Sequence, residues 1–192
     1  MNRRAVLAGA VTTLLAVNSG HAVGAPRDDS DFQTFVLDVA IDAHTLNLNV
    51  ADPVDPANPR RGTTFIVNGK IFPGGTIPSN VTPFDPNMAG SIGEWVCRGV
   101  FLADFSQIHS GAAALAFDTT QMFLFTTDEN ALFTEGFEGN VGVTTHRTVP
   151  GGTGRYRRVI GEVRQETIGV NRNGAADGLF DLRFTFKVRR VE

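Results

Sequence analysis

The feature that most constrains the fold of this chain is a two-residue alternation of apolar and polar side chains, which recurs from residue 33 to the C-terminus. Successive side chains of a β-strand point to opposite faces, so this alternation is typical of strands with one buried face. No run repeats its apolar residues convincingly at helical spacing. The 21 glycines and 15 phenylalanines among the 192 residues also favour β-structure over a helical bundle. The sequence therefore predicts an all-β domain.

Eight segments show this pattern, separated by turns or loops. The expected strands span residues 33–41 (with a continuation over 45–50), 63–72, 93–105, 115–126, 131–137, 141–148, 157–170 and 179–188. Unpaired sheet edges are a liability, so we expect eight sequential strands to close into an eight-stranded antiparallel β-barrel. A two-sheet sandwich is the alternative. Side chains fill the interior of such a barrel, or the interior holds one small ligand.

Two segments between and within these strands have more than one interpretation. Asn68-Gly69 indicates either a hairpin or a bend inside one long strand. Residues 73–90 contain four prolines and no helical period, which predicts a long irregular loop. Long loops in compact domains often act as lids, so we hypothesise that this loop gates the barrel mouth.

The first 25 residues have the features of an export signal. Arg3 and Arg4 precede an uninterrupted apolar-and-small run over 5–17, which is shorter than the roughly 20 residues of a membrane-spanning helix. The arginine pair fits either a twin-arginine or a general-secretion signal. We expect a signal peptide over 1–25, a flexible N-terminus over 26–32 and a barrel domain over 33–192. The protein is then periplasmic or secreted, with no membrane span after cleavage.

Charge is distributed unevenly along the chain. The formal net charge of −3 excludes a generally basic nucleic-acid-binding protein. Residues 26–146 carry 5 basic and 15 acidic side chains, whereas residues 147–192 carry 10 basic and 5 acidic ones. Two such poles could orient an anionic ligand or drive head-to-tail self-association. Solvated side chains at outward strand positions explain the same pattern, and we favour that interpretation.

A resemblance to a known barrel superfamily is carried by the C-terminal part of the chain. A Gly-Gly-Thr-Gly-Arg-Tyr turn over 151–156 precedes the strand sequences RVIGEVRQETIG and FDLRFTFKV. The order of the earlier elements also fits: a Gly69-Lys70 strand, a long loop and then GEWVCRGVFLADF. In these features the chain resembles the allene oxide cyclase and dirigent barrels.

The resemblance implies a small barrel, a homodimer or homotrimer, with an apolar pocket and no cofactor. Such pockets hold a lipid, polyketide or phenolic molecule and bias how it cyclises or couples. Allene oxide cyclases carry a glutamate and a cysteine inside the barrel. Cys97 lies about where that cysteine would be, whereas the first strand offers only Asp38 and Asp42 on its polar face and no glutamate.

Glu135 is the candidate catalytic acid or base. It shares a predicted strand face with Phe133 and Phe137. A carboxyl group buried between two aromatic rings has a raised pKa and suits proton transfer near neutral pH. The alternative is that this face lies outside, with Leu132 and Thr134 inside.

The candidate pocket lining consists of side chains that the alternation places on apolar faces. These residues are Trp95, Cys97, Phe101, Gln121, Phe133 and Phe137. Each has a structural alternative, since buried Trp and Cys are common core residues and a buried amide needs a partner in any fold. His44, His109 and His146 are far apart in sequence, so we expect no metal site.

Three functions fit these observations. The first is an exported barrel that binds an apolar small molecule. The second is a cyclase or isomerase that uses Glu135 in the same pocket. The third is a structural exported domain whose barrel is filled by its own phenylalanines. The sequence does not decide whether the protein is an enzyme.

Overall fold

A computed structural model describes residues 31–49, 58–79, 84–126, 129–139, 143–170 and 180–192. The predicted signal segment lies outside these residues. The described elements are β1 (Gln33–Asn49), β2 (Thr64–Pro73), β3 (Gly93–Phe101), α1 (Phe105–His109), β4 (Leu115–Phe125), β5 (Ala131–Gly139), β6 (Thr145–Gly152), the 3-10 helix η2 (Gly154–Tyr156), β7 (Val159–Val170) and β8 (Phe180–Arg190). None of the described helices has the length and apolarity needed to cross a membrane.

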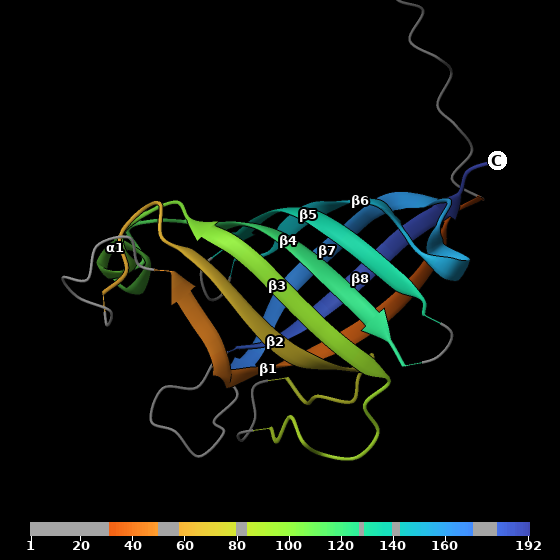
Figure 1. Ribbon diagram of the computed structural model, residues 1–192, viewed down its shortest axis with the longest axis horizontal. Helices are drawn as coiled ribbons and strands as arrows, with labels where there is room; N and C mark the ends of the chain where they lie inside the picture. The colour runs from red at the N-terminus through yellow and green to blue at the C-terminus, as the bar shows by residue number, and fades with distance from the viewer. Residues whose placement is uncertain (1–30, 50–57, 80–83, 127–128, 140–142, 171–179) are drawn as a thin grey trace, which may run out of the picture. The chain divides into compact units, whose positions relative to one another are not determined.

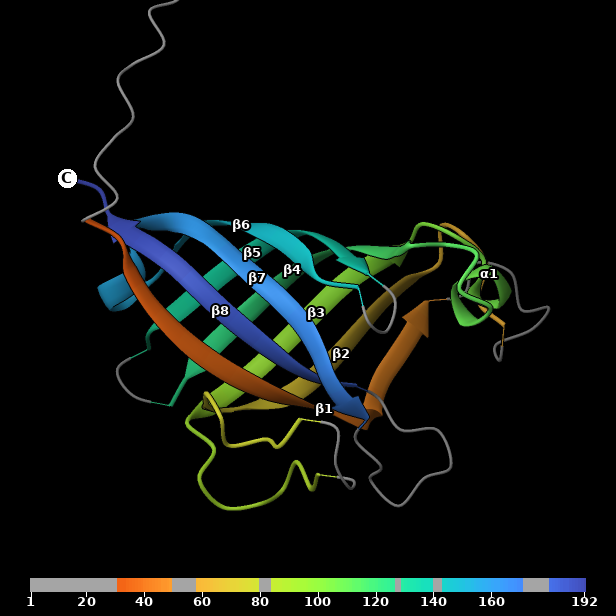
Figure 2. The same cartoon turned by 180° about the vertical axis from the view of Figure 1, so that it is seen from behind.

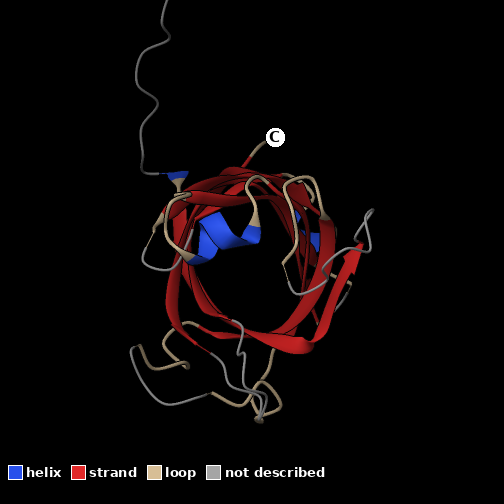
Figure 3. Ribbon diagram, turned by 90° about the vertical axis from the view of Figure 1, so that its left-hand side faces the viewer, coloured by secondary structure: helices blue, strands red, loops and turns tan. Residues whose placement is uncertain are grey.

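The eight strands form one closed antiparallel barrel in sequence order (Figures 1 and 2). β8 pairs with β1 from Gln33 opposite Val188 to Ala40 opposite Asp181, and this pairing removes both sheet edges. The predicted barrel is therefore confirmed, and the sandwich alternative is wrong. Figure 3 looks along the barrel, with the strands as a ring and α1 at the near end.

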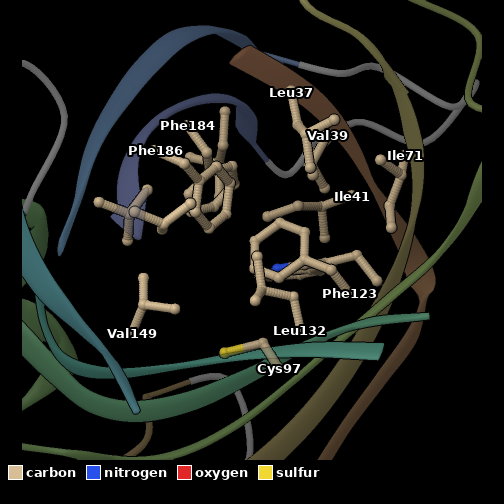
Figure 4. Close-up of a cluster of buried hydrophobic side chains, with 14 of the residues drawn as sticks. Leu37, Val39, Ile41, Ile71, Cys97, Phe123, Leu132, Val149, Phe184 and Phe186 are labelled. Carbon is tan, nitrogen blue, oxygen red and sulfur yellow. The ribbon is translucent and has the colours of Figure 1, made fainter. Parts of the chain in front are cut away.

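A layer of aromatic and aliphatic side chains fills the middle of the barrel. Phe123 packs edge-on against Phe184 and Phe186, with ring centroids 5.0 and 5.2 Å apart. Trp95 lies beside Phe184, and Leu132 is fully buried in the same cluster. Figure 4 shows Phe123, Leu132, Phe184 and Phe186, which come from several strands, pointing toward one another. Part of the barrel is thus filled by the chain's own phenylalanines, as the third functional interpretation requires.

The loop after β2 lies on the outer face of the barrel wall. Its residues Ile77 and Phe84 are buried against Phe72, Ala40 and Ile168, which belong to the outer faces of β2, β1 and β7. Figures 1 and 2 show this segment alongside the barrel, in yellow to light green. The described part of the loop therefore covers the wall, whereas the sequence suggested a gate at the mouth.

Two local differences from the predicted strands have clear physical causes. β3 ends at Phe101, and α1 begins after Asp104, whose N–H donates to the side-chain oxygen of Gln107 at 3.2 Å. Asn68-Gly69 lies inside β2, so the hairpin interpretation is wrong. A Cβ at Gly69 would come within 2.6 Å of the carbonyl oxygen of Ala40, so the close approach of β1 requires glycine.

Candidate functional site

Polar side chains occupy the barrel interior between the aromatic layer and the end that carries α1. They come from inward positions of five consecutive strands, and most of them are fully buried. We call this group the polar layer: Cys97 of β3, Thr119 and Gln121 of β4, Thr134 and Glu138 of β5, Arg147 of β6, and Gln165 of β7. Buried polar groups are stable only when they are paired, so this layer must form a connected network.

The Glu138 carboxylate collects hydrogen bonds at a single oxygen. Its Oε1 accepts from Gln121 Nε2 at 2.6 Å, from Thr119 Oγ1 at 2.8 Å and from the Cys97 thiol at 3.4 Å. None of the described residues donates a hydrogen bond to Oε2. The three hydrogen bonds thus fix one oxygen of the carboxylate. The side chain is 12% exposed, so the group keeps slight access to solvent.

Arg147 is held mainly by neutral oxygens, although its side chain is fully buried. It donates to the carbonyl oxygens of Gly136 and Thr119, both at 2.9 Å, and to Thr134 Oγ1 at 3.3 Å. Its Nη1 lies 3.9 Å from Glu138 Oε1. Burial lowers the pKa of Arg147, and the charge of Glu138 opposes that shift. A guanidinium starts from so high a pKa that it remains a fixed positive charge beside the carboxylate.

The Cys97 thiol acts as a weak hydrogen-bond donor in this layer. Burial raises its pKa well above the usual value, and the negative charge of Glu138 raises it further. The reactive form of cysteine is the thiolate, so a raised pKa disfavours nucleophilic attack. Gln121 also donates to Gln165 at 3.0 Å and accepts from Thr134 at 3.0 Å, which gives its amide structural partners.

The structure divides the candidate residues between the two faces of the wall. Trp95, Cys97, Phe101 and Gln121 are buried on the inner side. The Trp95 indole N–H has no acceptor among the described residues.

The predicted environment of Glu135 is corrected. Glu135 is exposed on the outer face together with Phe137, which is 48% exposed. Phe133 lies two residues before Glu135 in β5 and therefore on the same outer face. Leu132 and Thr134 are buried inside instead. The segment alternates equally well in either phase, and the structure confirms the alternative phase, in which the Glu135 face lies outside. Sequence reasoning missed Glu138 and Arg147, although Glu138 has the same parity along β5 as Leu132 and Thr134.

An open hollow of about 670 Å³ lies at the barrel end opposite α1, and we call it the mouth hollow. It is formed where β1 and β7 begin and β8 ends, next to η2. Its lining residues are Asp31, Gln33, Phe35, Arg155, Tyr156, Val159, Val188, Arg189 and Arg190. Phe35 stacks on Phe186 with ring centroids 4.7 Å apart, so the hollow adjoins the aromatic layer of the interior. Its volume falls within the roughly 300–1,000 Å³ range of small-molecule pockets.

Solved structures with the same barrel belong to proteins with different activities. The pterocarpan synthase dirigent protein PsPTS1 superposes with a TM-score of 0.60 at 13% identity, over 84% of this chain and 96% of that chain. Pyocyanin demethylase gives a TM-score of 0.50 at 13% identity, over 81% and 99%. The Diels-Alderase AbmU from Streptomyces koyangensis gives 0.50 at 14% identity, over 84% and 69%.

The chain thus has the barrel fold of a dirigent protein, in agreement with the sequence resemblance. No family model matches the sequence, and no curated protein matches it by sequence. Identities of 13–14% establish a common fold alone.

Proposed function

We propose that this chain is an exported barrel that binds an apolar small molecule and steers how that molecule cyclises or couples. The mouth hollow is the observation that carries the proposal. Its lining combines the apolar or aromatic residues Phe35, Tyr156, Val159 and Val188 with polar and charged ones, which is the composition of a small-molecule site. The dirigent protein and the Diels-Alderase with the same barrel are named for reactions on small molecules, which supports this class of function.

Mass spectrometry of denaturing organic extracts tests this proposal. The protein is purified from its native source, and we expect one lipid, polyketide or phenolic compound in stoichiometric amount. A neutral fluorescent probe, N-phenyl-1-naphthylamine, provides an independent test of the hollow. An empty extract together with no probe binding would contradict the proposal and favour the structural-domain interpretation. The homodimer or homotrimer stays a prediction, which light scattering on the same preparation tests.

A cyclase or isomerase is the second candidate, favoured by the convergence of donors on Glu138. Glu138 lies toward the α1 end of the barrel and does not line the mouth hollow, so this candidate requires substrate to bind at the α1 end. Glu138 takes the role of acid or base that the sequence assigned to Glu135. Arg147 supplies a fixed positive charge 3.9 Å from the carboxylate, and such a charge stabilises negative charge that develops during proton abstraction. Cys97 remains protonated and helps to position the carboxylate.

Replacing Glu138 by Gln separates the two candidates. The amide keeps the shape and an acceptor oxygen but removes the titratable group. If the protein is a cyclase, Glu138→Gln loses turnover of the compound found in the extract while binding is retained. Glu135→Gln is the matched control, since the same change is made three positions away on the outer face. Equal turnover in both variants would exclude Glu138 as the acid or base.

A further inference from the structure

The mouth hollow carries more positive charge than an apolar ligand needs. Three arginines line it, Arg155, Arg189 and Arg190, against the single carboxylate of Asp31. These arginines belong to the basic C-terminal part of the chain. The ion pairs among the described residues all lie elsewhere, so none of them neutralises an arginine of the hollow.

Neutral contacts order two of these side chains without cancelling their charge. Arg155 Nη2 donates to the Tyr156 hydroxyl at 2.7 Å, and its guanidinium carbon lies 4.8 Å from the centre of that ring. Arg190 Nη2 donates to the carbonyl oxygen of Arg155 at 3.0 Å. A guanidinium has five N–H donors, so each of these groups keeps donors for a further partner.

Aromatic rings and apolar side chains line the same hollow as these charges. Phe35 continues a parallel stack onto Phe186, with an interplanar angle of 8°. Tyr156 lies 5.3 Å from the Phe125 ring, and Val159 and Val188 complete the apolar surface. The hollow is thus lined by both aromatic rings and guanidinium groups, and a guanidinium forks onto carboxylate-type oxygens with good geometry.

We propose that the mouth hollow binds a flat aromatic anion, with its ring against Phe35 and Tyr156 and its acidic group among Arg155, Arg189 and Arg190. An aromatic carboxylate, sulfate or sulfonate meets this description. The inference rests on the proposed function, because it names the class of molecule that this hollow binds.

Two fluorescent probes with the same ring system test the inference on the purified protein. 8-Anilino-1-naphthalenesulfonate carries a sulfonate, and N-phenyl-1-naphthylamine lacks it. We expect Arg190→Gln and Arg189→Gln each to raise the Kd of the sulfonate about fivefold, since one charge-assisted contact contributes on the order of a factor of ten or less at an open site. Neither variant changes the Kd of the neutral probe, whose unchanged binding also shows that the barrel is folded.

The matched control is Arg60→Gln. This change removes the same charge from an exposed residue at the α1 end of the barrel, and the Kd of both probes stays unchanged. Added salt weakens the binding of the sulfonate probe and leaves the binding of the neutral probe unchanged, because ions screen only the charged contact.

Each other outcome has a defined meaning. If both probes bind and the Arg189 and Arg190 variants affect them equally, the anion preference is wrong while small-molecule binding stands. If neither probe binds, this inference is wrong, and if the organic extract is empty as well, the proposed function also fails. If inorganic sulfate displaces the sulfonate probe at constant ionic strength, the site recognises bare anions and the aromatic part of the inference is wrong.

Discussion

Two arginine–carboxylate clusters, one inside the barrel and one on its wall, use the same chemical groups in different ways. On the wall, Arg183 donates from Nε and Nη2 to the two oxygens of Asp38, at 2.8 and 3.0 Å. Asp38 Oδ2 also accepts from the backbone N–H groups of Gly75 and Ile77, and Arg183 Nη2 donates to the carbonyl oxygen of Ile77. We call this group the outer clasp, because it ties the loop after β2 to the wall.

Inside the barrel, the corresponding arginine and carboxylate do not hydrogen-bond to each other directly. Arg147 and Glu138 are 3.9 Å apart, and carbonyl oxygens take the arginine's shortest hydrogen bonds. The carboxylate is held at one oxygen only by the described residues. In the outer clasp both oxygens of Asp38 are hydrogen-bonded within the protein. In the polar layer Oε2 of Glu138 has no donor among the described residues, so it remains available to a ligand or a reaction. The difference predicts that the outer clasp is needed mainly for stability and the polar layer mainly for function.

The largest expected effect is the loss of stability in Asp38→Asn. The variant loses the charge that pairs with Arg183 and one of the two acceptor oxygens, so we expect the free energy of unfolding to fall by about 3 kcal/mol. Urea denaturation measures it. Asp118→Asn is the control, because Asp118 is exposed on the outer face of β4, and its change should stay within about 0.5 kcal/mol. Equal losses in the two variants would show that the outer clasp is not a stabilising element.

The next effect concerns Asp181, which lies beside the outer clasp. Burial, and then the charge of Asp38, raise the pKa of Asp181 to about 7, and its Oδ1 has no donor among the described residues. In the unfolded chain an aspartate has a pKa of about 3.9. Between these values the folded protein holds a proton that the unfolded chain has released. Stability therefore falls as pH rises from about 4 to about 7, and the loss is complete above that window.

Asp181→Asn removes this titration. We expect the variant to be more stable than the parent at about pH 8, by about 2 kcal/mol, and to differ little from it at about pH 4. Urea denaturation of both proteins across this pH range measures the difference in their free energies of unfolding. The contributions of the other titrating groups are the same in both proteins and cancel in this difference. Parallel stability curves would mean that Asp181 does not change its protonation in this window.

The third expected effect is a small loss of stability in Glu138→Gln. In Glu138→Gln the amide oxygen still accepts from Thr119 and Gln121. The ion pair with Arg147 is lost, but its charges are 3.9 Å apart and share no direct hydrogen bond, so we expect a stability change below about 1 kcal/mol. Thermal unfolding of this variant beside Asp38→Asn gives the ratio of the two effects. A loss as large as that of Asp38→Asn would make the polar layer a structural element and weaken the cyclase candidate.

The sequence predicted the strands and the closed barrel because alternation is a local property and eight sequential strands have few ways to protect their edges. It could not predict which face of β5 is buried. That face depends on the register with β4, in which Thr134 lies opposite Gln121. The inward direction of Gln121 was predicted correctly, so a known register would have placed Thr134 and then Glu138 inside as well.

The outer clasp lay beyond sequence reasoning for a different reason. Asp38 and Arg183 are 145 positions apart and meet only because β8 closes onto β1. The backbone N–H groups that bind Asp38 have no sequence signal at all. The mouth hollow was partly foreseeable, since the basic C-terminal pole is visible in the sequence. Its aromatic lining depends on the positions where three strands begin or end.

The smallest effect tests whether burial or distance sets the strength of these clusters. Lys70 and Glu94 are 2.7 Å apart, which is as close as Arg183 and Asp38, but their side chains are 38% and 61% exposed. Water already solvates both charges, so Glu94→Gln should change the free energy of unfolding by less than about 0.5 kcal/mol, and less again at high salt. Urea denaturation at two salt concentrations measures this. A loss near that of Asp38→Asn would mean that the distance between the charges matters more than their burial. The stability difference expected between the outer clasp and the polar layer would then follow from the charge separations alone, which are 2.8 Å for Arg183–Asp38 and 3.9 Å for Arg147–Glu138.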